Sequence, residues 1–331
     1  MQKKILFINT GNSVFTRPII ASLQAMEFQV YFFDNFSPNL ISKFWGVVKN
    51  RGLIKTSSFQ EKLNLYINDS LYKKALQINP DYIFVAKGKN ISSEVISNLR
   101  SKGYITMNWF PDYFDSWPWI STNASAYDYF FTPCLYVQKK LKEKKINSYY
   151  LPFGADADAR YKSNAKDYDA TFVGQYTKRR GRLFQMVHER KFLEVWGYQS
   201  WQRTKYKDVY HGVVPHSKCL SIIRRSKITL NTVTCEDGVP IISVNYRPFE
   251  ASGVGGFVLS WYHEPLGDFF EIGKEMETFS SPEEALEKTE YYLKNAASRE
   301  KIAYAGWRRT MREHTLLKRM QYAFDIVRRM S

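Results

Sequence analysis

Three cations follow a strand-like run in the second half of the chain. The apolar run Ala170–Gly174 ends in glycine, and Lys178, Arg179 and Arg180 come soon after it, where we expect a helix to begin. Helix-start amides combined with Lys or Arg bind diphosphates, because both offer hydrogen-bond donors and positive charge to the anion. A solvated basic loop is the ordinary alternative for such a run. The sequence leaves both interpretations open.

A glutamate lies in an unusual setting further along the chain. Glu250 stands between a phenylalanine and a run of small residues that includes Gly253, Gly255 and Gly256. We expect Glu250 at the start of a helix, where the helix dipole favours a carboxylate. There it can accept hydrogen bonds from two ribose hydroxyls, as acidic residues do in dinucleotide sites. The alternative is a helix-start charge followed by an ordinary glycine turn. Ser243, Asn245 and Arg247 are neighbouring candidates for contact with a ligand.

The segments that must position these residues alternate between apolar runs and helix-like stretches. We expect strands at the following ranges: 4–9, 30–33, 81–86, 104–108, 129–132, 148–151, 170–174, 193–197, 228–231 and 256–260. We expect helices from about Thr16 to Met26, over Ser92–Lys102 and from near Gly181. Ser281–Glu284 forms a capping box for a further helix, and Ser298 and Thr315 are expected caps for the last two. This alternation is typical of βαβ units with parallel sheets.

The strand and helix pattern restarts after Leu151–Asp156, a segment with the Pro and Gly of a linker. The sequence therefore predicts an α/β protein with two Rossmann-like domains facing a cleft. The expected boundaries are residues 1–152, residues 153–312, and a C-terminal helix over 313–331 that packs back toward the first domain. Ligands in such sheets bind beyond the carboxyl ends of the strands.

Composition limits the class of protein. The 331 residues are 44% hydrophobic and 24% charged, which is typical of a globular chain. The net charge of +16 favours an anionic partner: nucleotide phosphates, nucleic acid, an acidic polymer or a membrane surface. The three cysteines form no CxxC pair, and we expect reduced thiols in a cytoplasmic protein. We identify no signal peptide and no run of about 18 apolar residues that would span a membrane.

Several of these segments, taken in order, resemble one family. They are Phe172–Gly174 with its downstream Arg, Ser226–Asn231, Asn245–Glu250 with Gly255–Leu259, and Ala305–Gly306 followed by His314, Thr315 and Arg319. Together they resemble the spore maturation protein CgeB-like family, whose members are GT-B glycosyltransferases related to family 4. The resemblance covers roughly residues 150–325 and is looser over the first half, where the family has its acceptor domain.

The resemblance implies a nucleotide-sugar donor bound in the second domain, and a glycan, lipid-linked or protein acceptor bound in the first. Family 4 enzymes carry two glutamates eight positions apart, and Glu250 matches the second of them, which contacts the donor ribose. Ile242 stands at the first position, so the first glutamate is absent. Arg180-Gly181 matches a Lys-Gly that reaches the diphosphate. The remaining donor-site candidates are Gly174, Tyr176 and Trp196 and, after the first strand, Gly11.

A catalytic base in the first domain would have to be a carboxylate, because all five histidines lie in the second half. Asp112 and Asp115 stand among the aromatic residues of Trp109–Trp119, whose ring faces suit sugars and whose burial would raise a carboxyl pKa. A packed aromatic loop is the alternative.

We expect no metal ion and no cofactor besides the nucleotide sugar, because cations and amides stabilise the leaving diphosphate in such enzymes. The competing metal motif is Asp156-Ala-Asp158, which falls in the expected linker.

Three alternatives stay open. The first is a nucleic-acid-binding protein, which fits the charge but lacks any nucleic-acid motif, so we expect no nucleic-acid partner. The second is a relative that binds nucleotide without turnover. The third concerns location: Lys43–Arg51 mixes cations with apolar residues and would suit peripheral contact with an anionic membrane, although a solvated amphipathic helix explains it as well.

Overall fold

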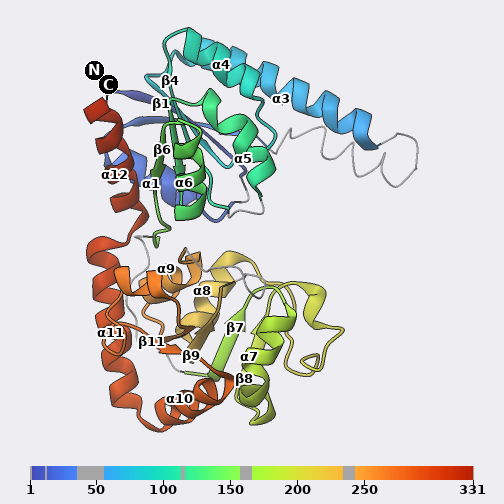
Figure 1. Ribbon diagram of the computed structural model, residues 1–331, viewed down its shortest axis with the longest axis vertical. Helices are drawn as coiled ribbons and strands as arrows, with labels where there is room; N and C mark the ends of the chain where they lie inside the picture. Colours follow the sequence, from blue (N-terminus) through green and yellow to red (C-terminus); the bar gives the residue numbers. More distant parts are fainter. Residues whose placement is uncertain are drawn as a thin grey trace. The chain divides into compact units, whose positions relative to one another are not determined.

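The structure is a computed structural model that describes residues 2–11, 13–35, 56–112, 116–156, 166–233 and 243–330, with side chains from residue 60 onward in the third range. The chain divides into two compact units (Figure 1). One unit comprises Met1–Pro152 together with Arg319–Ser331, and the other comprises Phe153–Lys318.

The first unit is built on a six-stranded parallel sheet with the strand order β2-β1-β3-β4-β5-β6. The strands are β1 (Lys4–Asn9), β2 (Gln29–Asp34), β3 (Tyr82–Ala86), β4 (Ile105–Trp109), β5 (Tyr129–Thr132) and β6 (Ser148–Tyr150). The α-helices between them are α1 (Thr16–Ala25), α3 (Thr56–Ile78), α4 (Ser93–Ser101), α5 (Trp117–Asn123) and α6 (Leu135–Glu143). The chain leaves β1 toward β2 and then crosses back to β3, so the topological switch point lies between β1 and β3.

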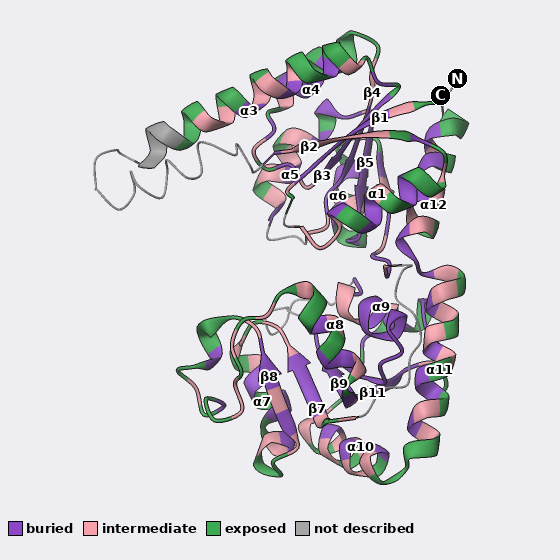
Figure 2. Cartoon of the chain, turned by 180° about the vertical axis from the view of Figure 1, so that it is seen from behind, coloured by how far each residue is buried: buried purple, intermediate pink, exposed green. Residues whose placement is uncertain are grey.

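Continuous apolar runs form the central strands because helices cover both faces of a parallel sheet. All five residues of β3 are buried, and Figure 2 shows buried residues concentrated on the strands. Helix starts follow local chemistry. Ser92, for example, caps α4 by accepting a hydrogen bond from the Val95 amide at 3.2 Å.

The last helix, α12 (Leu316–Met330), closes the core of the first unit. Thr315 caps it by accepting from the Lys318 amide at 3.2 Å, as the sequence predicts. Phe324 is fully buried, with its ring centroid 4.6 Å from that of Phe28 and 5.3 Å from that of Tyr82. The apolar face of this helix therefore fixes the chain terminus to the sheet.

The second unit has a five-stranded parallel sheet with the order β11-β10-β9-β7-β8. The strands are β7 (Tyr168–Val173), β8 (Leu193–Trp196), β9 (Ser226–Asn231), β10 (Val258–Trp261) and β11 (Glu277–Phe279). The α-helices are α7 (Lys178–Glu189), α8 (His216–Arg224), α9 (Tyr246–Gly253), α10 (Pro282–Lys294) and α11 (Ala296–Glu313). Here the switch point lies between β7 and β9, where an open α/β sheet binds its ligand.

Two local expectations need correction, and one long helix had no expectation at all. Glu250 is the fifth residue of α9 and not its start, because the helix begins at Tyr246 and tolerates Pro248 in a first turn whose amides need no helical acceptor. Ser298 lies inside α11, which begins at Ala296. The long helix α3 was not predicted.

Candidate functional site

The connection from β7 to α7 lies at one side of the switch point in the second unit. Thr177 caps α7, since its Oγ1 accepts a hydrogen bond from the Arg180 amide at 3.2 Å. Gly174 follows the strand where a Cβ would come within 2.9 Å of the Phe172 ring. The Gly174 carbonyl accepts a hydrogen bond from Trp201 Nε1 at 2.8 Å. The turn is thus held in place from both ends.

Arg180 is the third residue of α7 and is only 8% exposed. Its guanidinium donates to the Gln175 carbonyl at 2.7 Å and to the Thr232 carbonyl at 3.4 Å, and it stacks 5.1 Å above the Phe172 ring. Gln175 follows β7 and Thr232 follows β9, so this side chain joins the two loops that flank the switch point. Its positive charge is therefore fixed near the carboxyl edge of the sheet, the edge at which open α/β sheets bind ligands.

The two neighbouring cations are oriented differently. Lys178, the first residue of α7, is exposed, while the Arg179 guanidinium lies 5.2 Å from the centre of the Trp261 ring. Both belong to the first turn of the helix, whose amides carry partial positive charge. Lys178 is the exposed member of the group, so a ligand can reach it from solvent.

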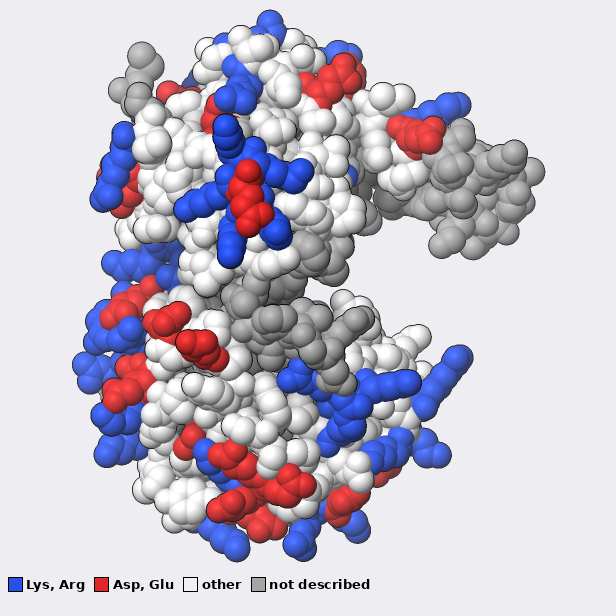
Figure 3. Space-filling model, in the orientation of Figure 1, with Lys and Arg blue, Asp and Glu red and all other residues white. Residues whose placement is uncertain are grey.

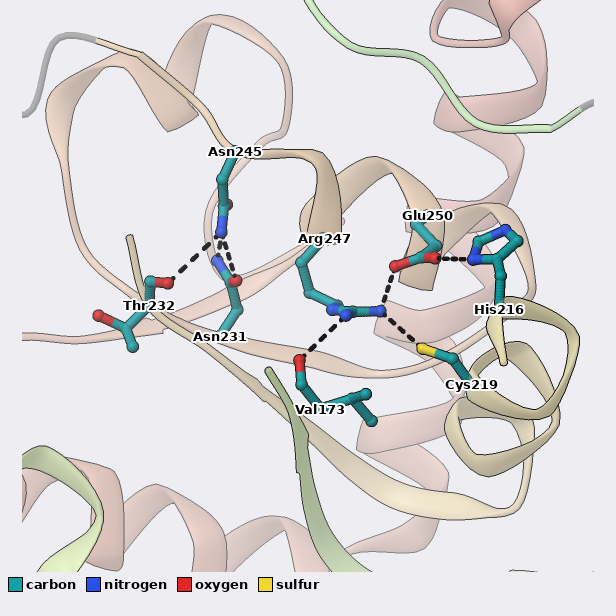
Figure 4. A network of polar contacts seen from close by, with 8 residues as sticks. All are labelled: Val173, His216, Cys219, Asn231, Thr232, Asn245, Arg247 and Glu250. Atoms are coloured by element: carbon teal, nitrogen blue, oxygen red, sulfur yellow. Dashed lines mark hydrogen bonds and ion pairs between the residues drawn. The ribbon is translucent and has the colours of Figure 1, made fainter. Parts of the chain in front are cut away.

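A buried ionic network lies at the other side of the switch point (Figure 4). The Glu250 side chain is only 3% exposed. One of its oxygens, Oε2, pairs with Arg247 Nη1 on the preceding turn of α9, and the other, Oε1, lies 3.0 Å from His216 Nδ1 on α8. The carboxylate is therefore directed at protein groups on both sides.

Arg247 connects this carboxylate to the sheet. Its Nη2 donates to the Val173 carbonyl at the end of β7 at 3.0 Å, and its Nη1 lies 3.1 Å from Cys219 Sγ (Figure 4). Burial is the largest single influence on the pKa of Arg247 and lowers it, but Glu250, Cys219 and Tyr246 together outweigh burial and leave that pKa above its ordinary value. Burial also raises the pKa of Cys219 to about 11, so the thiol is neutral at physiological pH.

A set of amides links the start of α9 to the end of β9. Asn245 Nδ2 donates to Asn231 Oδ1 at 3.0 Å and to the Thr232 carbonyl at 3.4 Å, and Asn231 Nδ2 donates to Ser260 Oγ at 2.9 Å. Ser243 is buried, and its hydroxyl has no hydrogen-bond partner in the part of the chain that the structure describes. Asn245 and Arg180 thus donate to the same Thr232 carbonyl at the end of β9.

The predicted aromatic candidates are packed against other rings. Tyr176 lies 5.0 Å from Trp201 in an edge-on arrangement. Trp196, the last residue of β8, is buried with its ring stacked on His211 at 4.5 Å and edge-on to Tyr168 at 5.0 Å. Contact between either ring and a nucleotide base stays a prediction.

In the first unit, Asp112 lies among cations. Its Oδ2 is 2.9 Å from Lys87 Nζ and 3.8 Å from Lys89 Nζ, and it accepts a hydrogen bond from Ser116 at 3.4 Å. Lys87 and Lys89 follow β3 and Asp112 follows β4, so the group lies at the carboxyl edge of the sheet. The carboxylate is therefore held beside two ammonium groups at this edge.

Gly11 lies at the same edge, where its amide donates to Asp34 Oδ1 at 3.0 Å. A Cβ at this position would come within 2.6 Å of that carboxylate.

Some candidates lie outside the described residues: Asp115, Ile242, Asp158 and the segment 43–51. Among the residues that are described, no group of three or more His, Cys, Asp or Glu side chains could hold a metal ion. Metal-independent chemistry stays a prediction.

No helix within the described ranges is both long and apolar enough to cross a membrane. Figure 3 shows Lys and Arg side chains on both units, interspersed with Asp and Glu, on the face in view.

Residues 179–325 match the glycosyl transferase-like family. That segment contains Arg179 and Arg180 of α7, His216 of α8 and the whole of α9, and it begins one residue after Lys178. No curated protein matches the chain.

Three solved structures are similar over nearly the whole length. Sucrose-phosphate synthase from Thermosynechococcus elongatus is 10% identical with a TM-score of 0.69, and the match covers 99% of each chain. HepE from Anabaena, solved in complex with UDP and glucose, is 8% identical with a TM-score of 0.61, covering 98% of this chain and 99% of that one. A putative UDP-N-acetylglucosamine 2-epimerase from Listeria monocytogenes is 13% identical with a TM-score of 0.53, covering 92% of each.

These likenesses confirm the fold class. The chain has two parallel-sheet, Rossmann-like α/β units and C-terminal helices, which is the GT-B fold. The fold hosts transferases and an epimerase alike, so the choice between activities depends on the site and on the matched segment.

Sequence reasoning missed two residues of the ionic network, His216 and Cys219. They lie 34 and 31 positions before Glu250 in the chain and come from a different helix. Pro215 directly before His216 signals a helix start, but nothing in the local pattern indicates that this helix begins beside Glu250.

Proposed function

We propose that this protein is a glycosyltransferase that transfers a sugar, of the hexose type, from a nucleotide-diphosphate sugar to a glycan, lipid-linked or protein acceptor. The observation that carries the proposal is the convergence of Arg180, Arg247 and Glu250 at the β7–β9 switch point, inside the segment that matches the glycosyl transferase-like family. The CgeB-like relationship suggested by the sequence motifs is consistent with that match and is part of the proposal.

In this proposal the nucleotide occupies the carboxyl edge of the second unit's sheet. The α7 start supplies partial positive charge to the diphosphate, and Lys178 adds a mobile ammonium. Arg180 contributes a further positive charge, whose position is fixed by hydrogen bonds from its guanidinium to two backbone carbonyls. These groups stabilise the leaving diphosphate without a metal ion, because they are oriented before the reaction begins.

The acceptor belongs to the first unit in this proposal, with Asp112 as the candidate base. Lys87 and Lys89 place two positive charges beside its carboxylate, which would accept a proton from an acceptor hydroxyl. A cytoplasmic location with peripheral contact on an anionic membrane surface is consistent with the net charge of +16.

Donor binding is tested by thermal shift with UDP, GDP, TDP, ADP and CMP, because a ligand that binds the native state raises its stability. Transfer and hydrolysis are then measured with the matching nucleotide sugars. We compare the wild type with Lys178→Ala, an exposed residue whose loss leaves the core intact, and with Lys294→Ala, an exposed lysine at the end of α10, as the matched control.

We expect Lys178→Ala to weaken diphosphate binding several-fold and Lys294→Ala to bind like the wild type. Absence of a shift with every nucleotide contradicts the proposal. Release of free nucleotide diphosphate together with an epimerised sugar, and no transfer to any acceptor, would indicate an epimerase of the same fold. A salt-dependent gel shift with random oligonucleotides, combined with no nucleotide binding, would favour the nucleic-acid alternative.

A further inference from the structure

His216 lies where a ligand of the second unit would bind, although its sequence context does not mark it. It is the first residue of α8, which follows the long connection after β8 and therefore begins at the carboxyl edge of the sheet. Its side chain is 26% exposed and its ring lies beside Glu250 (Figure 4). The two ring nitrogens have different surroundings.

The first nitrogen, Nδ1, lies 3.0 Å from Glu250 Oε1. Two lone pairs at that distance would repel, so Nδ1 carries a proton directed at the carboxylate. The other carboxylate oxygen pairs with Arg247, and only 3% of the Glu250 side chain is exposed. Glu250 is thus largely committed to protein partners, which leaves little of it for a ribose.

The second nitrogen, Nε2, is shielded from solvent and has no hydrogen-bond partner among the residues that the structure describes. A buried polar atom without a partner costs about 1–3 kcal/mol. A ring with its single proton on Nδ1 presents a lone pair at Nε2, which accepts a hydrogen bond. A hydroxyl is the matching donor, whereas a phosphate oxygen would place two acceptors against each other.

We propose that His216 contacts the ribose of the bound nucleotide through Nε2, and that Glu250 acts behind it as a positioning residue. This inference rests on the proposed function, because it assumes a nucleotide at the β7–β9 edge. The chain of contacts runs from the Val173 carbonyl through Arg247 and Glu250 to His216, so the sheet itself fixes the orientation of the ring. The carboxylate also fixes the proton on Nδ1.

The test uses UDP, 2′-deoxy-UDP and 3′-deoxy-UDP, with dissociation constants from titration calorimetry. His216→Asn places an amide near the position of Nδ1 and removes the distal nitrogen, so it keeps a donor toward Glu250 and loses the ribose contact. His216→Gln keeps a distal amide oxygen that still accepts from a hydroxyl. His188→Asn is the matched control, since His188 lies on α7 and packs on Tyr206, outside the network.

We expect the wild type to bind UDP about tenfold more tightly than at least one deoxy analogue, which corresponds to about 1.4 kcal/mol of binding free energy. In His216→Asn the affinity for UDP should fall about tenfold and the UDP-to-deoxy ratio should fall to about one. His216→Gln should keep part of the ratio, and His188→Asn should keep all of it. A ratio in His216→Asn equal to that of the wild type, with both deoxy analogues, overturns the inference.

A measurement without substitutions guards against misfolded variants. Nitrogen-15 spectra of the wild type follow the His216 Nε2 resonance as UDP is added, and the inference requires that resonance to shift. UDP binding with an unchanged Nε2 resonance overturns the role of His216 and leaves the proposed function standing. Failure of the wild type to bind any of the nucleotides overturns the proposed function itself, and this inference with it.

Discussion

Replacing Arg247 with methionine tests the ionic network most directly. The substitution keeps most of the side-chain volume and removes the positive charge that pairs with Glu250. The carboxylate then stays 3% exposed with His216 as its remaining partner among the contacts described. Breaking a buried ion pair by removing one partner costs about 3–5 kcal/mol, because an uncompensated charge stays buried. Since 18% of the Arg247 side chain is exposed, water screens part of the pair, and we expect the lower end, about 3 kcal/mol.

The assay is thermal unfolding followed by fluorescence. A loss of about 3 kcal/mol in a unit of this size lowers the melting temperature by roughly 6–12 °C. The double variant Arg247→Met with Glu250→Gln removes the orphaned charge as well, so we expect it to be more stable than Arg247→Met alone. Arg203→Met, at an exposed position after β8, is the matched control and should change stability by less than about 0.5 kcal/mol.

Two results would refute this reasoning. Arg247→Met with the stability of the Arg203 control would show that the pair contributes nothing to folding. A double variant less stable than Arg247→Met would show that Arg247 acts through its contacts with the strand end and the thiol, and not by compensating the Glu250 charge.

Other regions of the structure yield three further predictions. Phe324→Ala should destabilise the first unit by about 3–5 kcal/mol, because the ring is fully buried, whereas Tyr322→Ala, 52% exposed, should be nearly neutral in urea unfolding. Gly306→Ala should lower stability by about 1–3 kcal/mol, since its Cβ would come 2.2 Å from a backbone carbonyl oxygen. The control is Gly267→Ala, whose Cβ would meet nothing within 4 Å, and equal melting temperatures of the two variants would contradict this packing. Because burial raises the pKa of Cys219 from 9.0 to about 11, its contribution is present below pH 9 and is lost as pH rises toward 11. Cys219→Ala should lack that decline in urea unfolding, and native Cys219 should resist iodoacetamide at pH 8.

Local pattern was sufficient for most of the strands. The runs Lys4–Asn9 and Tyr129–Thr132 form β1 and β5 residue for residue, because a buried parallel strand is a short apolar run with polar ends. The capping box at Ser281 starts α10 as predicted, with Ser281 accepting from the Glu284 amide at 3.1 Å. The restart of the pattern after residue 151 predicted two α/β units, and the fold confirms that class.

Other features had no local signal. The helix α3 does not gather its apolar residues on one face, since Leu65 and Tyr66 are exposed while Leu71 is buried, so its period is hard to detect. The start of α9 was misplaced at Glu250, whereas the helix begins at Tyr246 and accommodates Pro248 in its first turn.

The sequence by itself determined which residues carry charge at the candidate site and which strands precede them. It marked Arg180 after a strand-like run that ends in glycine, and Arg247 and Glu250 ahead of a glycine-rich turn, because such patterns are visible in a linear sequence. Only the tertiary structure decided what these groups face. Arg180 donates to carbonyls in the loops after two separate strands, and Glu250 pairs with His216, 34 positions away. The reason is physical: strand order and helix packing bring distant segments to one sheet edge, and the burial and partners found there determine which group is left to meet a ligand.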